Sequence, residues 1–232
     1  MNIAVIPARG GSTRIPGKNI KLFSGKPMIA WAIDAAKAAN VFDRIIVSTD
    51  SELIADTAKR FGAEVPFVRP EILSDNHTPT APVLLHALGE LSSDSGICEH
   101  LCCIYPTVPF IEARYIAEGL ELLRLHNAPS VVSVTTYEFP VLRSLTMMDD
   151  GSIAFAWPEY ASTRSQDLPE FFHDAGQFYW LNVARFLEEK QLFTHGTLPL
   201  KLPRTIVQDL DTQEDWDVAE RMAQSRLIKA GC

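Results

Sequence analysis

The sequence predicts a single α/β domain built on a mostly parallel sheet with helices on both of its faces. Short apolar runs rich in β-branched residues alternate with stretches of helical periodicity along most of the chain. These apolar runs are continuous, as expected for strands that are buried on both faces of a sheet. The chain has 232 residues, of which 47% are hydrophobic and 22% charged, which suits one globular domain spanning 1–232.

The first part of the chain contains five expected strands and four expected helices. Pro27 is tolerated in the first turn of a helix, Ser51 is a possible N-cap, and Gly62 closes the helix that Ser51 begins. The expected strands are 3–7, 44–50, 64–68, 100–106 and 130–136, and the expected helices are 26–40, 51–62, 80–91 and 112–125.

The pattern changes over 137–175, where Pro, Asp and Ser are scattered and helical periodicity is weak. Asp150-Gly151 predicts a hairpin turn inside this segment. We interpret it as an excursion from the main sheet that carries substrate or subunit contacts. After it, the α/β pattern resumes with a strand at 176–182, a helix at 183–189 and a last helix capped near Thr212.

Composition excludes several classes of protein. The net charge of −8 argues against nonspecific nucleic-acid binding, which needs a broad basic surface. No apolar run reaches membrane-spanning length, and the opening MNIAVIPARGG does not read as a signal peptide, so we expect a cytoplasmic protein. The cysteines lack paired zinc-site spacing; they are Cys98, Cys102, Cys103 and Cys232. Cys102 and Cys103, in the apolar run LCCIY, are expected to be buried thiols in a reducing compartment.

The loop after the first strand, PARGGSTRIPGKN, is the strongest local signal for a ligand. Arg9, Arg14 and Lys18 place three cations beside three glycines at the carboxyl end of a strand, where open α/β sheets bind ligands. A P-loop would need Gly in place of Ser12 and Ser or Thr in place of Asn19, so that motif does not fit. The dinucleotide-binding motif GxGxxG is also absent. The alternative is a turn that binds nothing. The glycines that permit unusual backbone angles are Gly10, Gly11 and Gly17.

The run IPARGGSTRIPGKNIKLFSGKPMIAWAIDAA resembles the opening of the sugar-acid cytidylyltransferases, also called CMP-sialic acid synthetases. The resemblance continues through DRIIVSTDSELIADTAKRFGAEV, RPEILSD, YPTVPF and DLDTQEDW, and so spans nearly the whole chain. It implies a Rossmann-like nucleotidyltransferase fold of the glycosyltransferase-A type. Many members carry Lys where this chain has Thr13, which leaves open whether Arg14 compensates in holding the triphosphate.

Later segments resemble the pseudaminic acid branch of this family. TRSQDLPEFFHDAGQFYW carries the likeness, with Asp174-Ala175-Gly176-Gln177 where sialic acid members tend to have an Asn-Gly pair. Tyr105 stands where those members tend to have Gln. Both differences fall where the family contacts the sugar. The sugar-binding candidates are therefore Tyr105, Gln166, Asp174, Gln177 and Tyr179.

The resemblance implies that CTP and a nine-carbon 2-keto sugar acid give a CMP-sugar and pyrophosphate. Arg9, Ser12 and Lys18 would hold the phosphates, and Arg69 and Thr80 would form the cytosine pocket. The full set of expected nucleotide contacts is Ala8, Arg9, Gly10, Gly11, Ser12, Lys18, Asn19, Arg69 and Thr80, and the expected catalytic residues are Arg9, Lys18, Asp209 and Asp211.

Asp209 and Asp211 are two residues apart, so an extended segment would project both side chains to one face. Two carboxylates of this kind suit Mg²⁺, and the family uses Asp residues at this position as metal ligands. The alternative is that these acids only stabilise the start of the helix near Thr212, where the helix dipole favours negative charge. Asp209 is also a candidate to deprotonate the sugar hydroxyl.

Three readings of function remain. The first is transfer to pseudaminic acid. The second is the same reaction on N-acetylneuraminic, legionaminic or Kdo sugar acid, and the third is a nucleotide-binding module without catalysis. The resemblance also implies a homodimer, with 137–175 as the dimer arm. His77 and His173 lie in plausible site loops but receive no catalytic role.

Overall fold

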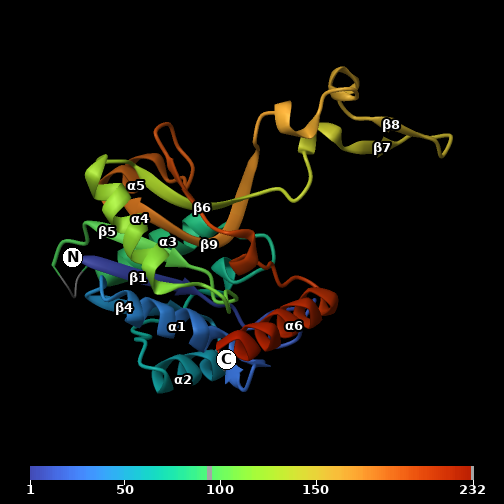
Figure 1. Ribbon diagram of the computed structural model, residues 1–232. Coiled ribbons are helices and arrows are strands. Elements are labelled where there is room, and N and C mark those ends of the chain that lie inside the picture. The colour runs from blue at the N-terminus through green and yellow to red at the C-terminus, as the bar shows by residue number, and fades with distance from the viewer. Residues whose placement is uncertain (93–95, 231–232) are drawn as a thin grey trace.

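The computed structural model describes residues 1–92 and 96–230, with side chains as far as residue 226 (Figure 1). Its centre is a six-stranded sheet in the order β10-β6-β9-β5-β1-β4. All neighbouring strands are parallel except β9, which runs antiparallel to both β5 and β6. The strands are β1 (Asn2–Pro7), β4 (Arg44–Ser48), β5 (His100–Ile104), β6 (Ser130–Thr136), β9 (Phe172–Asn182) and β10 (Leu198–Lys201).

Two hydrophobic layers cover the faces of this sheet because successive strand residues point in opposite directions. Ala4 and Ile6 of β1 pack into one layer, whereas Ile3 and Val5 pack into the other. The first layer receives α1 (Met28–Ala39), α2 (Glu52–Arg60), α4 (Ala113–Leu125) and α6 (Gln213–Ala230), and the second receives α3 (Thr80–Leu91) and α5 (Val183–Glu189). The mostly parallel α/β sheet expected from the sequence is confirmed.

The helix ends follow the signals in the sequence. The Ser51 side chain accepts a hydrogen bond from the Ile54 N–H (3.4 Å), and Gly62, with φ +89°, follows the end of α2. Thr212 and Asp215 cap α6 reciprocally: the Thr212 N–H donates to Asp215 Oδ2 (2.7 Å) and the Asp215 N–H donates to Thr212 Oγ1 (3.2 Å).

One expected strand is wrong. Residues 64–68 form only an isolated bridge, in which Glu64 pairs with Ile46 beside β4. Pro66 has no N–H to continue the ladder, so the chain leaves the sheet there. The sequence also did not predict β10 or the two-residue strands β2 (Leu22–Phe23) and β3 (Lys26–Pro27).

The segment after β6 leaves the body of the protein as an arm, which we define as residues 137–171 (Figure 1). Its tip is a hairpin of β7 (Leu145–Met147) and β8 (Ile153–Phe155), which confirms the turn expected at Asp150-Gly151. The arm ends four residues earlier than expected, because residues 172–175 already belong to β9, where Phe172, His173 and Asp174 pair with β6.

Cys102 and Cys103 are buried in β5, and burial raises the pKa of both thiols. Cys98 is half-buried, and burial raises its pKa to about 11. Cys232 lies outside the described residues. No described helix combines the length and apolar character needed to cross a membrane.

Candidate active site

Most of the expected site residues gather beyond the carboxyl ends of β1, β4 and β5. β1 lies between β4 and β5: the chain passes from β1 to β4 on one side of it and later reaches β5 on the other. Open α/β sheets bind ligands where the chain changes direction in this way. A cavity of about 370 Å³ opens there, which we call the loop cavity. It is lined by Pro7, Arg9, Ser12, Arg14, Lys18, Asn19, Arg69, Leu73, Asp75, Asn76, Thr78, Thr80, Val83, Tyr105, Pro106 and Thr107.

The loop after β1 is held by backbone and side-chain hydrogen bonds. The Ala8 N–H donates to Ser48 O (2.9 Å), and the Asn19 side-chain amide donates to Arg9 O (2.9 Å). Of the three glycines, only Gly17 has a positive φ, at +62°. Six of the nine expected nucleotide residues line the loop cavity, whereas Ala8, Gly10 and Gly11 do not.

Asp50, which the sequence analysis did not single out, anchors this loop. Its Oδ1 accepts a hydrogen bond from the Gly10 N–H (2.8 Å) and lies 3.8 Å from the Arg69 guanidinium. The only sequence signal was an acidic residue just beyond the end of β4. Asp50 therefore connects the glycine loop to Arg69.

Arg69 is a buried cation, only 4% exposed, on the wall of the loop cavity. Burial lowers the pKa of its guanidinium, and the charge of Asp50 opposes that effect. Its Nε and one terminal nitrogen lack hydrogen-bond partners. Buried donors of this kind favour a ligand that supplies acceptors. Asn76 faces the same cavity, and its side-chain oxygen accepts a hydrogen bond from Arg9.

Lys18 and Arg14 bring the loop against the segment that precedes α6. Arg14 lies 2.7 Å from one oxygen of Asp211, and the Lys18 ammonium lies 3.7 Å from the other. Lys18 also donates to Leu210 O (2.6 Å). Burial lowers the pKa of Lys18, and the charges of Asp211 and Asp209 oppose that effect. Both acids therefore lie within electrostatic reach of the same ammonium.

This donor set fits Mg²⁺ in its chemistry. Within 1–92 and 96–230, no group of three or more His, Cys, Asp or Glu side chains is placed to hold a metal. Mg²⁺ commonly takes one or two carboxylates together with waters and phosphate oxygens, so two acids beside a loop expected to hold phosphates are a sufficient number. Asp209 and Asp211 do not lie in a strand, however, and they line different surfaces: Asp211 faces the loop cations and Asp209 faces a second cavity.

That second cavity, of about 430 Å³, is lined by three carboxylates, and we call it the acidic cavity. Its carboxylates are Glu138, Asp174 and Asp209; the remaining lining is Thr135, Thr136, His173, Ala175, Gly176, Arg204, Val207, Gln208 and Met222. The first residues of β9 therefore lie beside the segment that holds the candidate metal ligands.

A chain of polar contacts connects the two cavities. The Tyr105 and Thr80 hydroxyls are 2.9 Å apart in the loop cavity, and the rings of Tyr105 and Tyr179 meet edge to face. The Tyr179 hydroxyl donates to Asp174 Oδ2 (2.6 Å), in the acidic cavity. Burial raises the pKa of both tyrosines, so both remain neutral donors at ordinary pH.

Gln177 joins this group, because its backbone oxygen accepts a hydrogen bond from the Tyr105 N–H (3.0 Å), so four of the five sugar candidates lie together. Gln177 is 2% exposed, and its side-chain oxygen has no hydrogen-bond partner. Gln166 lies apart, on a short 3₁₀ turn of the arm (Ser165–Asp167), and lines neither cavity.

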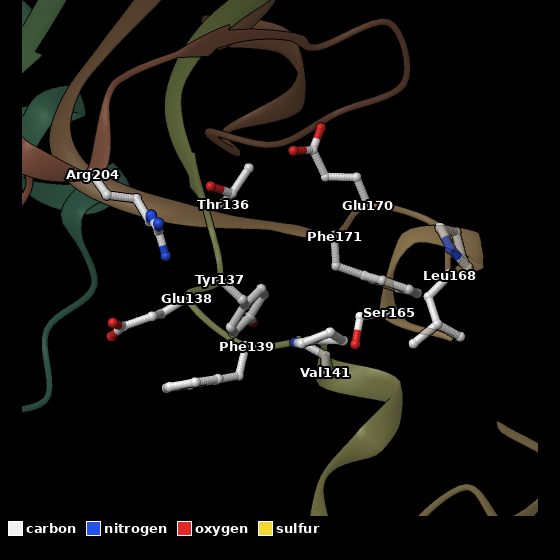
Figure 2. A pocket seen from close by; sticks show the side chains of 12 residues that line it. Thr136, Tyr137, Glu138, Phe139, Val141, Ser165, Leu168, Glu170, Phe171 and Arg204 are labelled. Carbon is white, nitrogen blue, oxygen red and sulfur yellow. The ribbon is translucent and has the colours of Figure 1, made fainter. Parts of the chain in front are cut away.

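A third cavity, of about 320 Å³, lies where the arm leaves the body, and we call it the arm cavity (Figure 2). Glu138 and Arg204 lie toward one end of the view, and Leu168 and Phe171 toward the other. Thr136, Glu138 and Arg204 line both this cavity and the acidic one. The two cavities are therefore adjacent.

Comparison with known proteins gives a consistent result. A family model described as Cytidylyltransferase matches residues 3–231. The pseudaminic acid cytidylyltransferase of Campylobacter jejuni subsp. jejuni serotype O:23/36 (strain 81-176) is 36% identical over 219 residues, which cover 94% of each chain. The CMP-N,N'-diacetyllegionaminic acid synthase of Legionella pneumophila subsp. pneumophila (strain Philadelphia 1) is 31% identical, with 96% of each chain covered.

Solved structures share the fold. A CMP:2-keto-3-deoxy-manno-octonic acid synthetase complexed with CTP superposes with a TM-score of 0.68 at 16% identity, covering 97% of this chain and 99% of the other. The 4-diphosphocytidyl-2C-methyl-D-erythritol synthase of Anaerococcus prevotii superposes with a TM-score of 0.63 at 15% identity, covering 96% and 98%. At these identities the likeness establishes the architecture alone.

Proposed function

Because the chain belongs to the cytidylyltransferase family, we propose that it transfers the CMP unit of CTP to pseudaminic acid, with release of pyrophosphate. The observation that carries the reaction class is the loop cavity. There Arg9, Arg14 and Lys18 converge beside the buried, incompletely hydrogen-bonded Arg69, so cations for phosphates and donors for a base share one site.

The anomeric hydroxyl of the sugar attacks the α-phosphorus of CTP. A bond forms between that oxygen and the α-phosphorus. The bond from the α-phosphorus to the oxygen bridging it to the β-phosphorus breaks, so pyrophosphate leaves, and the hydroxyl proton passes to a base. Arg9 and Lys18 hold the phosphates and neutralise the charge that develops on them, which is how enzymes catalyse most reactions of this type. Asp209, exposed in the acidic cavity, is the candidate base.

Asp209 and Asp211 would hold Mg²⁺, which when bound neutralises phosphate charge. In the structure Asp211 is paired with Arg14 and Lys18. Negative phosphates compete for both of these cations, so binding of CTP would release the Asp211 carboxylate for other ligands.

The choice of pseudaminic acid as the sugar rests on the relatives and on Tyr105. The relative named for pseudaminic acid is 36% identical and the one named for legionaminic acid is 31% identical. Tyr105 presents an aromatic ring between the two cavities, which suits a deoxygenated sugar better than an amide would. We also propose a homodimer in which the arm makes the contact between subunits.

The test is product identification. The protein is incubated with Mg²⁺, pseudaminic acid and CTP, ATP, GTP or UTP in turn, and the products are identified by mass spectrometry. CMP-pseudaminic acid and an equal amount of pyrophosphate are expected with CTP. Comparable pyrophosphate release from ATP would contradict the cytosine pocket, since buried polar groups reject bases that leave them unpaired.

A further inference from the structure

Arg204 is a cation with no protein partner at the junction of the acidic cavity and the arm cavity. Its exposed side chain makes no ion pair or hydrogen bond within 1–92 and 96–226, the range with described side chains. Figure 2 shows its guanidinium extending from the body toward the chain that carries Thr136 and Glu138. It lines both cavities.

The other charged side chains that line the two cavities are carboxylates. Glu138, Asp174 and Asp209 line the acidic cavity, and Glu138 and Glu170 line the arm cavity. Glu170 is paired with Lys201 at 3.0 Å, and Asp174 accepts hydrogen bonds from the Tyr179 hydroxyl and the Gly176 N–H. Among the described residues that line these two cavities, Arg204 is the only Arg or Lys.

Among the charged side chains described in these two linings, Arg204 alone attracts an anionic substrate. We infer that Arg204 binds the carboxylate of the sugar acid, through the paired N–H groups that a guanidinium offers to a carboxylate. The inference rests on the proposed function, because it assigns a role toward the proposed sugar substrate. It also orients that substrate: the carboxylate lies at Arg204, and the anomeric carbon beside it lies near Asp209, five residues along the chain.

The loop cavity is separate from this contact, since Arg204 is not among its lining residues. Loss of Arg204 should therefore weaken sugar binding without changing CTP binding. If Arg204 only supported the fold, its loss would weaken binding of both CTP and the sugar. It would also weaken the charged and the uncharged form of the sugar alike.

The experiment measures binding by calorimetry, with an α,β-methylene analogue of CTP present so that no turnover occurs. Pseudaminic acid and its uncharged C1 amide are titrated into the wild type, Arg204→Ala, Arg204→Lys and Arg143→Ala. Arg143 is the matched control, because it is an exposed Arg of the arm that lines none of the three cavities.

We expect Arg204→Ala to weaken pseudaminic acid binding about 10- to 100-fold, as for a lost charged hydrogen bond. Arg204→Lys should recover part of the loss, and Arg143→Ala should match the wild type. The amide should bind the wild type and Arg204→Ala equally weakly.

Two results overturn the inference alone: Arg204→Ala binds pseudaminic acid as tightly as the wild type does, or it weakens the acid and the amide by the same factor. A wild type that binds the CTP analogue but not the sugar overturns the proposed substrate itself. The two failures are therefore distinguishable.

Discussion

Asp211 shows how closely the expected catalytic groups of this protein depend on one another. Its two oxygens lie 2.7 Å from Arg14 and 3.7 Å from Lys18, while its own N–H donates to Asp215 Oδ2 (3.1 Å) at the start of α6. The backbone of Asp211 is thus held by the cap of α6, while its carboxylate faces the cations of the loop after β1. Its side chain is 37% exposed, so the pairs contribute little to stability.

Asp211→Asn should lower turnover in Mg²⁺ by about 100-fold or more, because one ligand that stabilises phosphate charge is lost. The melting temperature should stay close to that of the wild type. Steady-state kinetics and thermal unfolding measure the two effects, with Asp217→Asn, an exposed acid of α6, as the control. A folded Asp211→Asn variant with near-wild-type activity would remove Asp211 from the site.

Asp50→Ala should weaken CTP binding about 10- to 100-fold, because the variant loses a charged hydrogen bond to the Gly10 N–H and the partner of buried Arg69. Calorimetry with CTP measures the change. Asp56→Ala is the control, since it removes the same charge from the exposed face of α2. Equal CTP affinity in Asp50→Ala and the wild type would show that Asp50 does not position this loop.

Sequence reasoning found the cations of the loop because three of them stand beside glycines at a strand end. It missed Asp50 because an acidic residue after a strand is common and its partners, Gly10 and Arg69, are distant in sequence. It expected backbone groups of Ala8 and Gly10 to meet the nucleotide, but their N–H groups are already bonded to Ser48 and Asp50. Only the fold reveals which donors are already used.

At the scale of the element, α4 packs on β9 through a close contact at Gly119. A Cβ built on Gly119 would lie 2.7 Å from Trp180 Cδ1, and the Trp180 indole N–H donates to Ile116 O in the same helix (2.8 Å). Trp180 is fully buried, so it has little room to move. The missing side chain therefore sets how closely this helix approaches the sheet.

Gly119→Ala should destabilise the protein by about 1–3 kcal/mol, the usual range for overpacking a core. The matched control is Gly89→Ala in α3, where a Cβ meets nothing within 4 Å. That change should raise stability by about 0.4–1 kcal/mol through the helix propensity of Ala. Urea denaturation measures both, and a stabilised Gly119→Ala would contradict the packing described here.

Periodicity predicted most of the helices and the inner strands, because those elements carry continuous apolar runs or clear caps. Two of the failures involve prolines. The predicted strand 64–68 contains Pro66, where the chain leaves the sheet after one bridge, and the unpredicted strand β10 contains Pro199. β10 tolerates Pro199 because it is an edge strand that pairs only with β6.

At the scale of the whole molecule, the hairpin of the arm leaves large apolar side chains exposed. Met147 and Ile153 form a cross-strand pair on its hairpin and are 77% and 64% exposed. Surfaces of this kind mark contacts between proteins. The sequence indicated an excursion here, but its direction away from the body depends on the turns at its base.

Met147→Lys combined with Ile153→Lys should shift the protein from dimer to monomer, because two charges would enter the apolar contact that we propose. Sedimentation velocity at micromolar concentration measures the shift. Leu125→Lys, on an 80% exposed residue at the end of α4, should leave the dimer intact. A wild type that sediments as a monomer would contradict the proposed role of the arm.

The identity of the sugar is the central claim, and a competition between two sugars tests it most directly. Wild-type protein receives CTP, Mg²⁺ and equal concentrations of pseudaminic acid and N-acetylneuraminic acid, and the initial rates of the two CMP-sugars give the ratio of their kcat/KM values. We expect the ratio to favour pseudaminic acid by about 100-fold or more, since a site built for one pattern of hydroxyls rejects another. A ratio of one, or a preference for N-acetylneuraminic acid, would contradict the assignment.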